Sequence, residues 1–243
     1  MGISFPLLAA IWLRFADAGM EQGGSTGFQC GYVNMRTICL LAQKGGTGKT
    51  TLCLHLATLA SELGRNTAII DIDPQASASA WKRRRQQDTP EVVRHHARDL
   101  SSVLADLEQQ HKELVFLDTA PHSSHDAATA AGLADLVLIV SRPAILDLEA
   151  IGESVKIVKQ QGNQSAIVLN ACPPPHSGGE TTIVREAREA LCVYDLPVSP
   201  VSISQRAAFS HALIDGRAVT EFETTGKAAG EIHNLYDWLE THW

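Results

Sequence analysis

The stretch that decides the fold reads Gln43-Lys44-Gly45-Gly46-Thr47-Gly48-Lys49-Thr50-Thr51 and directly follows a short apolar run at residues 38–42. Its glycines let successive backbone N–H groups converge on phosphate oxygens, and the N-terminus of a following helix adds partial positive charge. In such a loop Lys49 reaches the terminal phosphates of a nucleotide, and the hydroxyl of Thr50 ligates Mg²⁺. The stretch therefore predicts a phosphate-binding loop between a strand and a helix.

The loop departs from the standard pattern G-x-x-x-x-G-K-[ST], because Gln43 stands where the first glycine belongs. It fits the variant K-G-G-x-x-K-[ST], in which a second lysine, Lys44, opens the loop. A chance Gly-rich turn is the alternative, and it leaves unexplained why a strand pattern, two lysines, a threonine and a helix pattern stand in register.

Elsewhere the chain alternates short apolar runs with longer helix-like segments. The apolar runs, of strand length and rich in β-branched residues or leucine, lie at residues 38–42, 67–70, 114–117, 136–140 and 166–169. The segments with helical length and spacing lie at residues 51–63, 76–87, 100–110, 145–161 and 182–194. Strands that alternate with helices predict an α/β fold, with a doubly wound, mostly parallel sheet and helices on both faces. Ligands of such sheets bind beyond the carboxyl ends of the strands, so the residues after each strand are the candidates for chemistry.

Aspartates follow the second and third of these predicted strands. Asp71 and Asp73 end the second, on the same side of an extended chain, before Pro74 turns it. Beside a phosphate loop, one of these carboxylates would support the metal shell and the other would orient the attacking water. An Asp-Pro turn capped by Asp71 is the alternative. Asp118 ends the third strand in the Walker B position, from which an aspartate holds Mg²⁺ through water.

The last predicted strand ends in Asn170. Its amide offers both a hydrogen-bond donor and an acceptor, which suits the edge of a purine base. A loop amide without that role fits the spacing equally well, so both interpretations stay open.

The composition is that of a soluble chain with one domain, or with one domain and an appendage. Among 243 residues, 44% are hydrophobic, and 20 Lys and Arg against 27 Asp and Glu give a net charge of −7. This charge excludes a polybasic protein that coats nucleic acid, so any DNA contact must come from a local basic patch. The 5 cysteines form no C-x-x-C pair, which excludes a zinc knuckle or a disulfide framework and favours a reducing compartment.

The start of the chain differs in character from the rest. The apolar run at residues 5–13 is shorter than the roughly 18 residues needed to span a bilayer. No Lys or Arg precedes it, which argues against a signal peptide. Residues 21–31 are Gly-rich and aperiodic. We therefore expect residues 1–34 to be a flexible extension, non-native or disordered, and residues 35–243 to form the folded domain.

The loop KGGTGKTT, followed in order by DIDPQ at residues 71–75 and FLDTAP at residues 116–121, resembles the ParA/MinD group of deviant-Walker ATPases. The stretches at residues 141–143 and 204–217 resemble the short ParA proteins that plasmids encode for DNA partition. This resemblance covers residues 35–243 and implies a P-loop NTPase fold with a deviant Walker A loop. It implies a cytoplasmic, nucleoid-associated ATPase that uses ATP and Mg²⁺, has weak basal activity and forms a homodimer in the ATP state. The implied partners are non-specific DNA and a ParB-type centromere-binding protein, both of which stimulate hydrolysis, and no membrane is involved.

The resemblance also implies a role for each residue that matches a family motif. Lys44 corresponds to a lysine that crosses the dimer interface to the phosphates of the other subunit, Lys49 to the lysine that binds the β- and γ-phosphates, and Asp73 to the water-positioning aspartate. These three are the implied catalytic residues, and the implied metal residues are Thr50, Asp71 and Asp118. The implied nucleotide contacts are Lys44, Gly45, Gly46, Thr47, Gly48, Lys49, Thr50, Thr51 at the α-phosphate and Asn170 near the adenine.

DNA contacts are expected at one of two places. Arg206 and Lys227 fall where the family's DNA-contacting residues lie near the C-terminus. The competing site is the densest basic stretch of the chain, formed by Lys82, Arg83, Arg84 and Arg85. Four consecutive charges wrap around a helix, so a solvated helix face is the alternative for this stretch.

Two further patterns have simpler interpretations. The segment His122-Ser-Ser-His125-Asp126 has residue types that bind metals, yet beside the Walker B position it predicts a polar interface loop rather than a zinc site. A C-terminal helix is expected to dock onto the domain, because its charges are mostly acidic where a membrane-binding helix is basic. Its apolar residues at helical spacing are Ile232, Leu235, Tyr236 and Leu239.

Three functions remain open on these grounds. The first is a DNA-partition ATPase, and the second is a related ATPase that positions a protein cargo such as a chemotaxis cluster or a carboxysome. The third is a metabolic member of the same superfamily, such as a cobyrinate or dethiobiotin synthetase. The Lys44 pattern disfavours the dethiobiotin synthetase, and these 243 residues leave no length for the amidotransferase domain of the cobyrinate enzyme.

Overall fold

The computed structural model describes residues 34–175 and 179–242. The expected extension, residues 1–34, lies outside this part of the chain except for Asn34. The domain expected at residues 35–243 lies within it, apart from residues 176–178 and Trp243.

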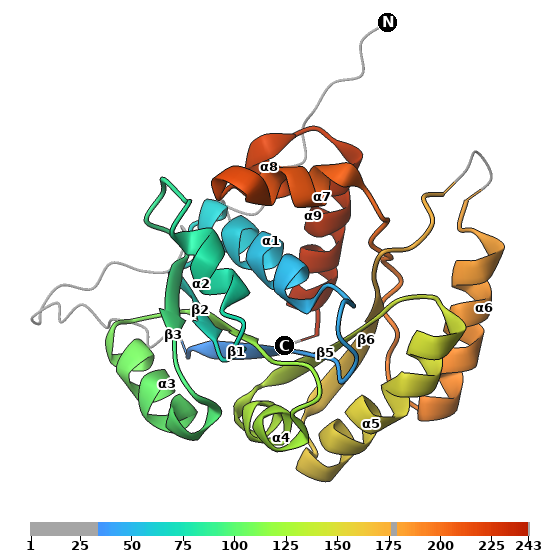
Figure 1. The fold of residues 1–243 in the computed structure, drawn as a ribbon, viewed down its shortest axis with the longest axis horizontal. Helices are drawn as coiled ribbons and strands as arrows, with labels where there is room; N and C mark the ends of the chain where they lie inside the picture. Colours follow the sequence, from blue (N-terminus) through green and yellow to red (C-terminus); the bar gives the residue numbers. More distant parts are fainter. Residues whose placement is uncertain (1–33, 176–178, 243) are drawn as a thin grey trace, which may run out of the picture. The chain divides into compact units, whose positions relative to one another are not determined.

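A parallel β-sheet runs through the centre of the described chain (Figure 1). Its six strands are β1 Arg36–Leu41, β2 Thr67–Asp71, β3 Glu91–Arg94, β4 Leu114–Asp118, β5 Leu136–Ser141 and β6 Gln164–Leu169. Their order is β3-β2-β4-β1-β5-β6, and every pair is parallel. After β1 the chain forms the half of the sheet that ends in β3, and after β4 it crosses to form the half that ends in β6. The strand order therefore reverses beside β1. Doubly wound sheets bind their ligands at this kind of position.

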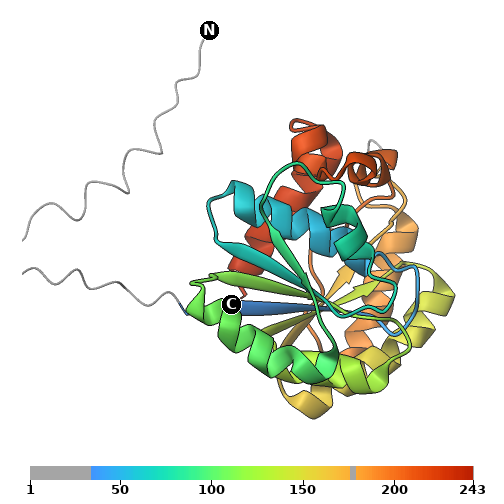
Figure 2. The ribbon, with the colours of Figure 1, turned by 60° about the vertical axis from the view of Figure 1, so that its left-hand side comes forward.

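Helices cover both faces of the sheet, as the alternating pattern predicts (Figure 1). One layer contains α1 Lys49–Glu62, α2 Ser77–Lys82, α7 Ala207–Ala212, α8 Val219–Phe222 and α9 Lys227–Glu240. The other contains α3 Leu100–Gln109, α4 Ser124–Leu133, α5 Ile145–Gln161 and α6 Thr182–Leu191. Figure 2 shows the same two layers on either side of the strands. The expected α/β fold is confirmed.

Side chains alternate along each strand and build a separate core on each face. In β1, Ile38 and Leu40 join the core under α1, whereas Cys39 and Leu41 join the core under the opposite layer. Helix α1 is buried along most of its length because it lies between the sheet and the C-terminal helices α8 and α9. An all-round apolar helix is what such a position requires.

Several local features differ from the sequence-based expectation. Strand β3 was not expected, because its four residues offer only two apolar side chains at the edge of the sheet. The segment expected to be a polar loop at residues 122–126 enters α4 at Ser124. The helix expected over residues 182–194 ends at Leu191 and continues as a 3₁₀ turn, Cys192–Tyr194.

The helix expected over residues 76–87 also ends early, at Lys82. The following chain turns back, and basic side chains bind the carbonyl oxygens that it presents. The ammonium group of Lys82 donates to the carbonyl of Pro90 at 3.1 Å, and the guanidinium of Arg85 donates to that of Thr89 at 2.6 Å. Lys82 and Arg85, two of the residues expected either to contact DNA or to lie on a solvated helix face, therefore stabilise a turn.

The expected docking of the C-terminal helix is confirmed, because its four apolar residues at helical spacing are buried in α9. No helix within the described ranges is both long enough and apolar enough to cross a membrane.

Candidate functional site

The expected phosphate loop follows β1 and ends at the first turn of α1, where Lys49 is the first helical residue. The φ angle is 76° at Gly46 and 93° at Gly48, a left-handed conformation that residues with a Cβ atom rarely adopt. No backbone N–H from Gly45 to Gly48 donates a hydrogen bond to any described residue. A run of unpaired N–H groups at a helix N-terminus is the arrangement that binds phosphate.

Asn170, at the end of β6, braces this loop from the side. Its Nδ2 atom donates to the carbonyl oxygen of Thr47 at 2.7 Å, and its side chain is buried. A Cβ atom added to Gly48 would lie 2.2 Å from the same nitrogen, so only glycine fits there. The amide donor expected to read a purine is therefore bound to the loop backbone, and the adenine contact stays a prediction.

Thr50 and Asp118 meet below the loop. The Thr50 hydroxyl donates to the Oδ1 atom of Asp118 at 3.1 Å, while the Oδ2 atom of Asp118 is buried with no hydrogen-bond partner among the described residues. Burial raises the pKa of Asp118 to about 7, and the charge of Asp71, its neighbour in the adjacent strand, also raises it. An orphaned buried carboxylate oxygen next to a threonine hydroxyl fits a site for Mg²⁺, which prefers oxygen ligands.

Lys49 is 5% exposed and interacts electrostatically with the carboxylates of Asp118 and Asp73. Burial lowers its pKa, and the charges of Asp118 and Asp73 act in the opposite direction. Lys49, Thr50, Asp73 and Asp118 therefore come together as the sequence predicts, although they come from three separate segments. Thr51 follows as a half-buried residue of α1.

Asp71 and Asp73 differ in what surrounds their oxygens. Asp71 is fully buried, and both of its oxygens accept hydrogen bonds: Oδ1 from the N–H of Asp73 and Oδ2 from the N–H and hydroxyl of Ser79. Asp73 is 9% exposed, and its Oδ1 atom accepts the N–H of Gln75 at 2.8 Å. No described residue donates to its Oδ2 atom, which stays available to a water molecule.

Lys44 forms an ion pair with Asp147, which was not among the residues predicted from the sequence. Its Nζ atom lies 2.9 Å from Oδ2 of Asp147, in the first turn of α5. The guanidinium of Arg142 binds the same carboxylate, with 3.0 Å from Nε to Oδ1. Burial raises the pKa of Asp147, but the hydrogen bonds from Arg142 and Lys44 outweigh it and leave the pKa below its usual range. The only sequence signal was that residues 141–143 resemble a family motif.

The residues expected to contact DNA are engaged to different extents. Lys82 and Arg85 bind the turn after α2, and Arg85 also forms a buried ion pair with Glu221 at 2.7 Å. Arg84 donates to the carbonyls of Ala80 and Leu213. Arg206 pairs with Glu231 at 2.7 Å. Arg83 and Lys227 are exposed.

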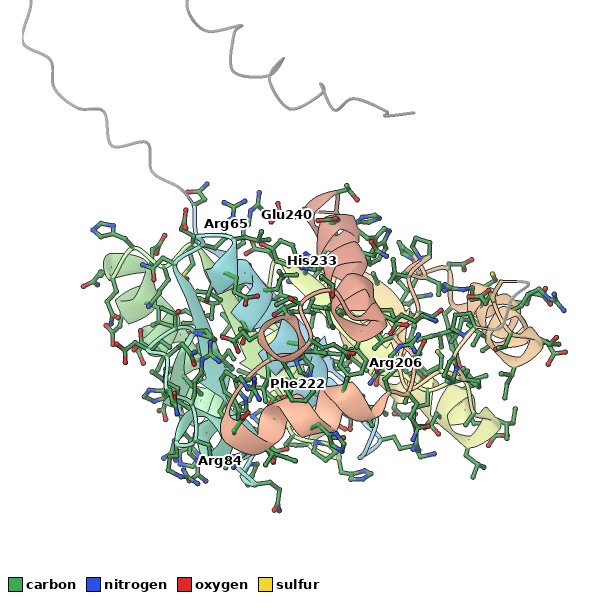
Figure 3. The ribbon with its side chains drawn as sticks, turned by 90° about the horizontal axis from the view of Figure 1, so that it is seen from above. Arg65, Arg84, Arg206, Phe222, His233 and Glu240 are labelled. Atoms are coloured by element: carbon green, nitrogen blue, oxygen red, sulfur yellow. The ribbon has the colours of Figure 1, made fainter. Side chains whose placement is uncertain are left out.

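The two expected DNA sites also lie apart on the surface. Arg206 caps the start of α7, and Arg84 binds the residue that ends it, Leu213. Figure 3 accordingly shows Arg84 and Arg206 at opposite ends of that helix. The structure therefore does not join the two basic groups into one patch.

The histidines near β4 do not converge with other ligands. His122 lies in the turn before α4 and His125 in its first turn. Across residues 34–175 and 179–242, no group of three or more His, Cys, Asp or Glu side chains is arranged to hold a metal ion.

Comparison with known proteins agrees with this geometry. Residues 38–219 match the family model described as the CobQ/CobB/MinD/ParA nucleotide binding domain. The maintenance of carboxysome distribution protein A of Halothiobacillus neapolitanus is 25% identical over an alignment of 212 positions, gaps included, that covers 82% of this chain and 94% of that protein. Protein IncC of Escherichia coli is 24% identical over an alignment of 271 positions, gaps included, that covers 91% of this chain and 73% of that protein.

Solved structures resemble the fold. The apo McdA protein of Cyanothece has a TM-score of 0.71 at 15% identity, covering 84% of this chain and 99% of that one. The septum site-determining protein MinD of Pyrococcus horikoshii, complexed with Mg-ADP, has a TM-score of 0.69 at 18% identity, covering 84% and 96% of the two chains. The expected resemblance is confirmed: with a family model matched over most of its length, this chain belongs to the CobQ/CobB/MinD/ParA family of nucleotide-binding domains.

Proposed function

We propose that the chain hydrolyses ATP, with Mg²⁺, at the carboxyl ends of β1, β2 and β4. The observation that carries this proposal is the convergence of Lys49, Thr50, Asp73 and Asp118 on a loop whose N–H groups are unpaired. Phosphoryl transfer depends on positioning and charge neutralisation more than on covalent help from the protein, and this site offers both.

Each residue of the site has a separate role in binding the nucleotide or Mg²⁺. The N–H groups of Gly45 to Gly48 bind phosphate oxygens, Lys49 binds the β- and γ-phosphates, and Thr51 binds the α-phosphate. Thr50 would hold Mg²⁺ directly and Asp118 through water, with Asp71 adding negative charge from the neighbouring strand; bound Mg²⁺ supplies charge neutralisation at the phosphates.

Asp73 orients the attacking water in this proposal. The water oxygen forms a bond to the γ-phosphorus while the bond from that phosphorus to the β–γ bridging oxygen breaks. ADP leaves with the electron pair, and the water protons pass to solvent and to the released phosphate. A carboxylate with one oxygen held by Gln75 and the other available to water suits this role.

Turnover is gated by dimerisation in this proposal. Lys44 of one subunit reaches the phosphates bound by the other, in the manner of an arginine finger, a class worth about 10³ to 10⁵ in rate. The monomer would hydrolyse ATP weakly because it lacks the Lys44 of a second subunit, and its own Lys44 is bound to Asp147. A partner protein of the ParB type and DNA would raise the rate by favouring the dimer.

The cargo is either a protein assembly or a DNA molecule. A relative that matches over nearly its whole length is named for carboxysome distribution, and this favours an ATPase that positions a protein cargo in the cytoplasm. The ParA part of the family description keeps DNA partition as the second candidate. In both cases we propose that the ATP-bound dimer binds non-specific DNA through exposed basic residues.

Nucleotide binding is tested with Lys49→Ala and a labelled ATP analogue. Removing the buried cation should weaken binding at least about tenfold, or 1.4 kcal/mol. Lys156→Ala, which removes an exposed lysine of α5, is the matched control and should bind normally. Unchanged binding by Lys49→Ala would disprove the phosphate-loop assignment.

DNA binding is tested with the full chain and random-sequence duplex DNA, in the presence of ATP and of ADP. ATP-dependent binding supports the binding to non-specific DNA that we propose for both candidate functions. If the chain does not bind duplex DNA even with ATP at low salt, DNA partition loses its mechanism. An ATPase that positions a protein cargo without binding DNA then becomes the proposed function. The neighbouring gene, ParB-like or encoding a cargo protein, separates the two candidates.

A further inference from the structure

The turn that carries Asp73 is held at its far end by one serine. Asp71 ends β2, fully buried, and its Oδ2 atom accepts two hydrogen bonds from Ser79, from the hydroxyl at 2.7 Å and from the N–H at 2.8 Å. Its Oδ1 atom accepts the N–H of Asp73 at 3.2 Å. One carboxylate therefore ties together both ends of the segment at residues 73–79.

Asp71 acts as a remote cap for α2. The N-terminal N–H groups of a helix lack acceptors within the helix, and a side-chain oxygen at the N-cap residue usually supplies one. Here the N-cap residue is Ala76, which has no such oxygen. Asp71, eight residues before Ser79, supplies the acceptor instead. Its Oδ2 atom accepts the N–H of Ser79, and the Ser79 hydroxyl donates to the same oxygen.

The turn between these two ends sets the direction of the Asp73 side chain. The N–H of Gln75 donates to Oδ1 of Asp73, and the N–H of Ala76 donates to its carbonyl oxygen, both at 2.8 Å. Ala76 has a φ angle of 53°, a left-handed conformation that costs energy in a residue with a Cβ atom. A strained turn keeps its shape only while its ends are held.

The other end of α2 is anchored independently. The indole N–H of Trp81 donates to the carbonyl of Arg217 at 3.2 Å, and Arg85 pairs with Glu221 at 2.7 Å. A Cβ atom at Gly216 would lie 2.3 Å from the backbone nitrogen of Arg85, so the two segments are in close contact. If the hydrogen bonds from Ser79 weaken, these contacts keep the other end of α2 in place. The turn at residues 73–76 is then the part that can move.

We propose that Ser79 is a positioning residue for ATP hydrolysis, which acts by holding Asp71 and, through the turn at residues 73–76, the carboxylate of Asp73. The inference rests on the proposed function, in which Asp73 orients the attacking water. Water attack depends steeply on geometry, whereas phosphate binding by the loop does not involve this turn. Ser79 should therefore affect turnover without affecting nucleotide affinity.

The test compares four variants of the full chain in single-turnover hydrolysis and in binding of a labelled ATP analogue. Ser79→Ala should hydrolyse bound ATP about tenfold more slowly, with a Kd within about twofold of the parent. Ser79→Thr keeps the hydroxyl and should restore the rate to within about twofold. Ser77→Ala is the matched control, because Ser77 is an exposed serine of the same helix with no side-chain hydrogen bond to a described residue.

Asp73→Ala separates failure of this inference from failure of the proposed function. If Asp73→Ala hydrolyses ATP normally, the role of Asp73 is wrong and the inference falls with it. If Asp73→Ala is inactive while Ser79→Ala keeps the parental rate, only the inference is overturned. It is also overturned if Ser79→Ala loses affinity as much as rate, or if Ser79→Thr fails to restore the rate, since either result indicates a general structural role.

Discussion

The Nζ atom of Lys44 lies 2.9 Å from Oδ2 of Asp147, so the lysine proposed to serve the other subunit is bound within its own. The Asp147 side chain is 2% exposed and that of Lys44 is 30% exposed. Any movement of Lys44 across an interface must first break this pair. The ion pair is therefore expected to oppose dimerisation.

Asp147→Asn should strengthen ATP-dependent dimerisation. A partly exposed ion pair is worth about 1 kcal/mol, so the dimerisation constant should rise about fivefold for each lysine released. Sedimentation with ATP, in an Asp73→Ala background that blocks turnover, measures the change. Lys44→Ala is the control and should abolish the ATP-dependent dimer; equal dimerisation by Asp147→Asn and its parent would refute the restraint.

Stability should depend on pH through His55, which lies in the core next to α8. Its Nδ1 atom accepts the N–H of Val219 at 3.0 Å, and burial lowers its pKa from 6.5 to about 4. Between these two pKa values the unfolded chain binds a proton that the folded chain does not, so stability falls as the pH falls. From pH 7 to pH 5 the loss from this group is about 2 kcal/mol.

Urea unfolding of His55→Gln at the two pH values measures that loss. The variant keeps a hydrogen-bond acceptor but not the titration, so its stability should fall about 2 kcal/mol less than that of the parent. His96→Gln changes an exposed histidine and should show the full loss. Parallel behaviour of parent and His55→Gln would rule out His55 as the source.

Ala76→Gly should stabilise the protein. Ala76 has a φ angle of 53°, where a Cβ atom costs about 1 to 2 kcal/mol and glycine costs nothing. Glycine loses more entropy on folding, which leaves a net gain of about 0.5 to 1 kcal/mol. Urea unfolding checks this, with Ala80→Gly in the regular part of α2 as a control that should destabilise by about 1 kcal/mol. A destabilised Ala76→Gly would contradict the assigned strain.

Neighbouring arginines after α2 should behave differently. Arg85→Ala leaves Glu221 unpaired in a buried position and should cost about 3 kcal/mol of stability, whereas Arg83→Ala should change it by less than about 0.5 kcal/mol.

DNA binding should depend on the exposed basic residues rather than on Arg85. Arg83 and Lys227 are exposed, and removal of a side chain that binds a DNA phosphate should flatten the slope of log affinity against log salt by roughly 0.9 for each subunit of the dimer.

A salt titration of duplex binding with ATP measures this for Arg83→Ala and Lys227→Ala. Arg206→Ala is the informative comparison, because Arg206 is already paired with Glu231. If Arg206→Ala flattens the slope more than Lys227→Ala, the pairing with Glu231 does not keep Arg206 from DNA.

The parts of the site that could be predicted lie either in one continuous segment or at the ends of neighbouring parallel strands. The loop from Lys44 to Thr51 is one continuous segment, and a parallel sheet brings Asp71 and Asp118 to the same edge, where they are paired in register. The type of each residue and its place after a strand were therefore sufficient.

The parts that were missed depend on contacts between distant segments. Lys44 and Asp147 are 103 positions apart, and nothing in the pattern near either residue indicates their pairing. The basic stretch at residues 82–85 was predicted to contact DNA or to form a solvated helix face, because the backbone carbonyls and Glu221 that bind Lys82 and Arg85 are not revealed by a local pattern. Strand β3 was missed because edge strands carry less apolar sequence than central ones.

The brace between Asn170 and Thr47 bears on how binding energy is used. A flexible loop loses about 1 to 2 kcal/mol of conformational entropy for each residue that a ligand orders. Here the 2.7 Å bond from β6 holds the loop in place in the free protein, so that loss accompanies folding rather than binding. More of the nucleotide's interaction energy then remains as affinity.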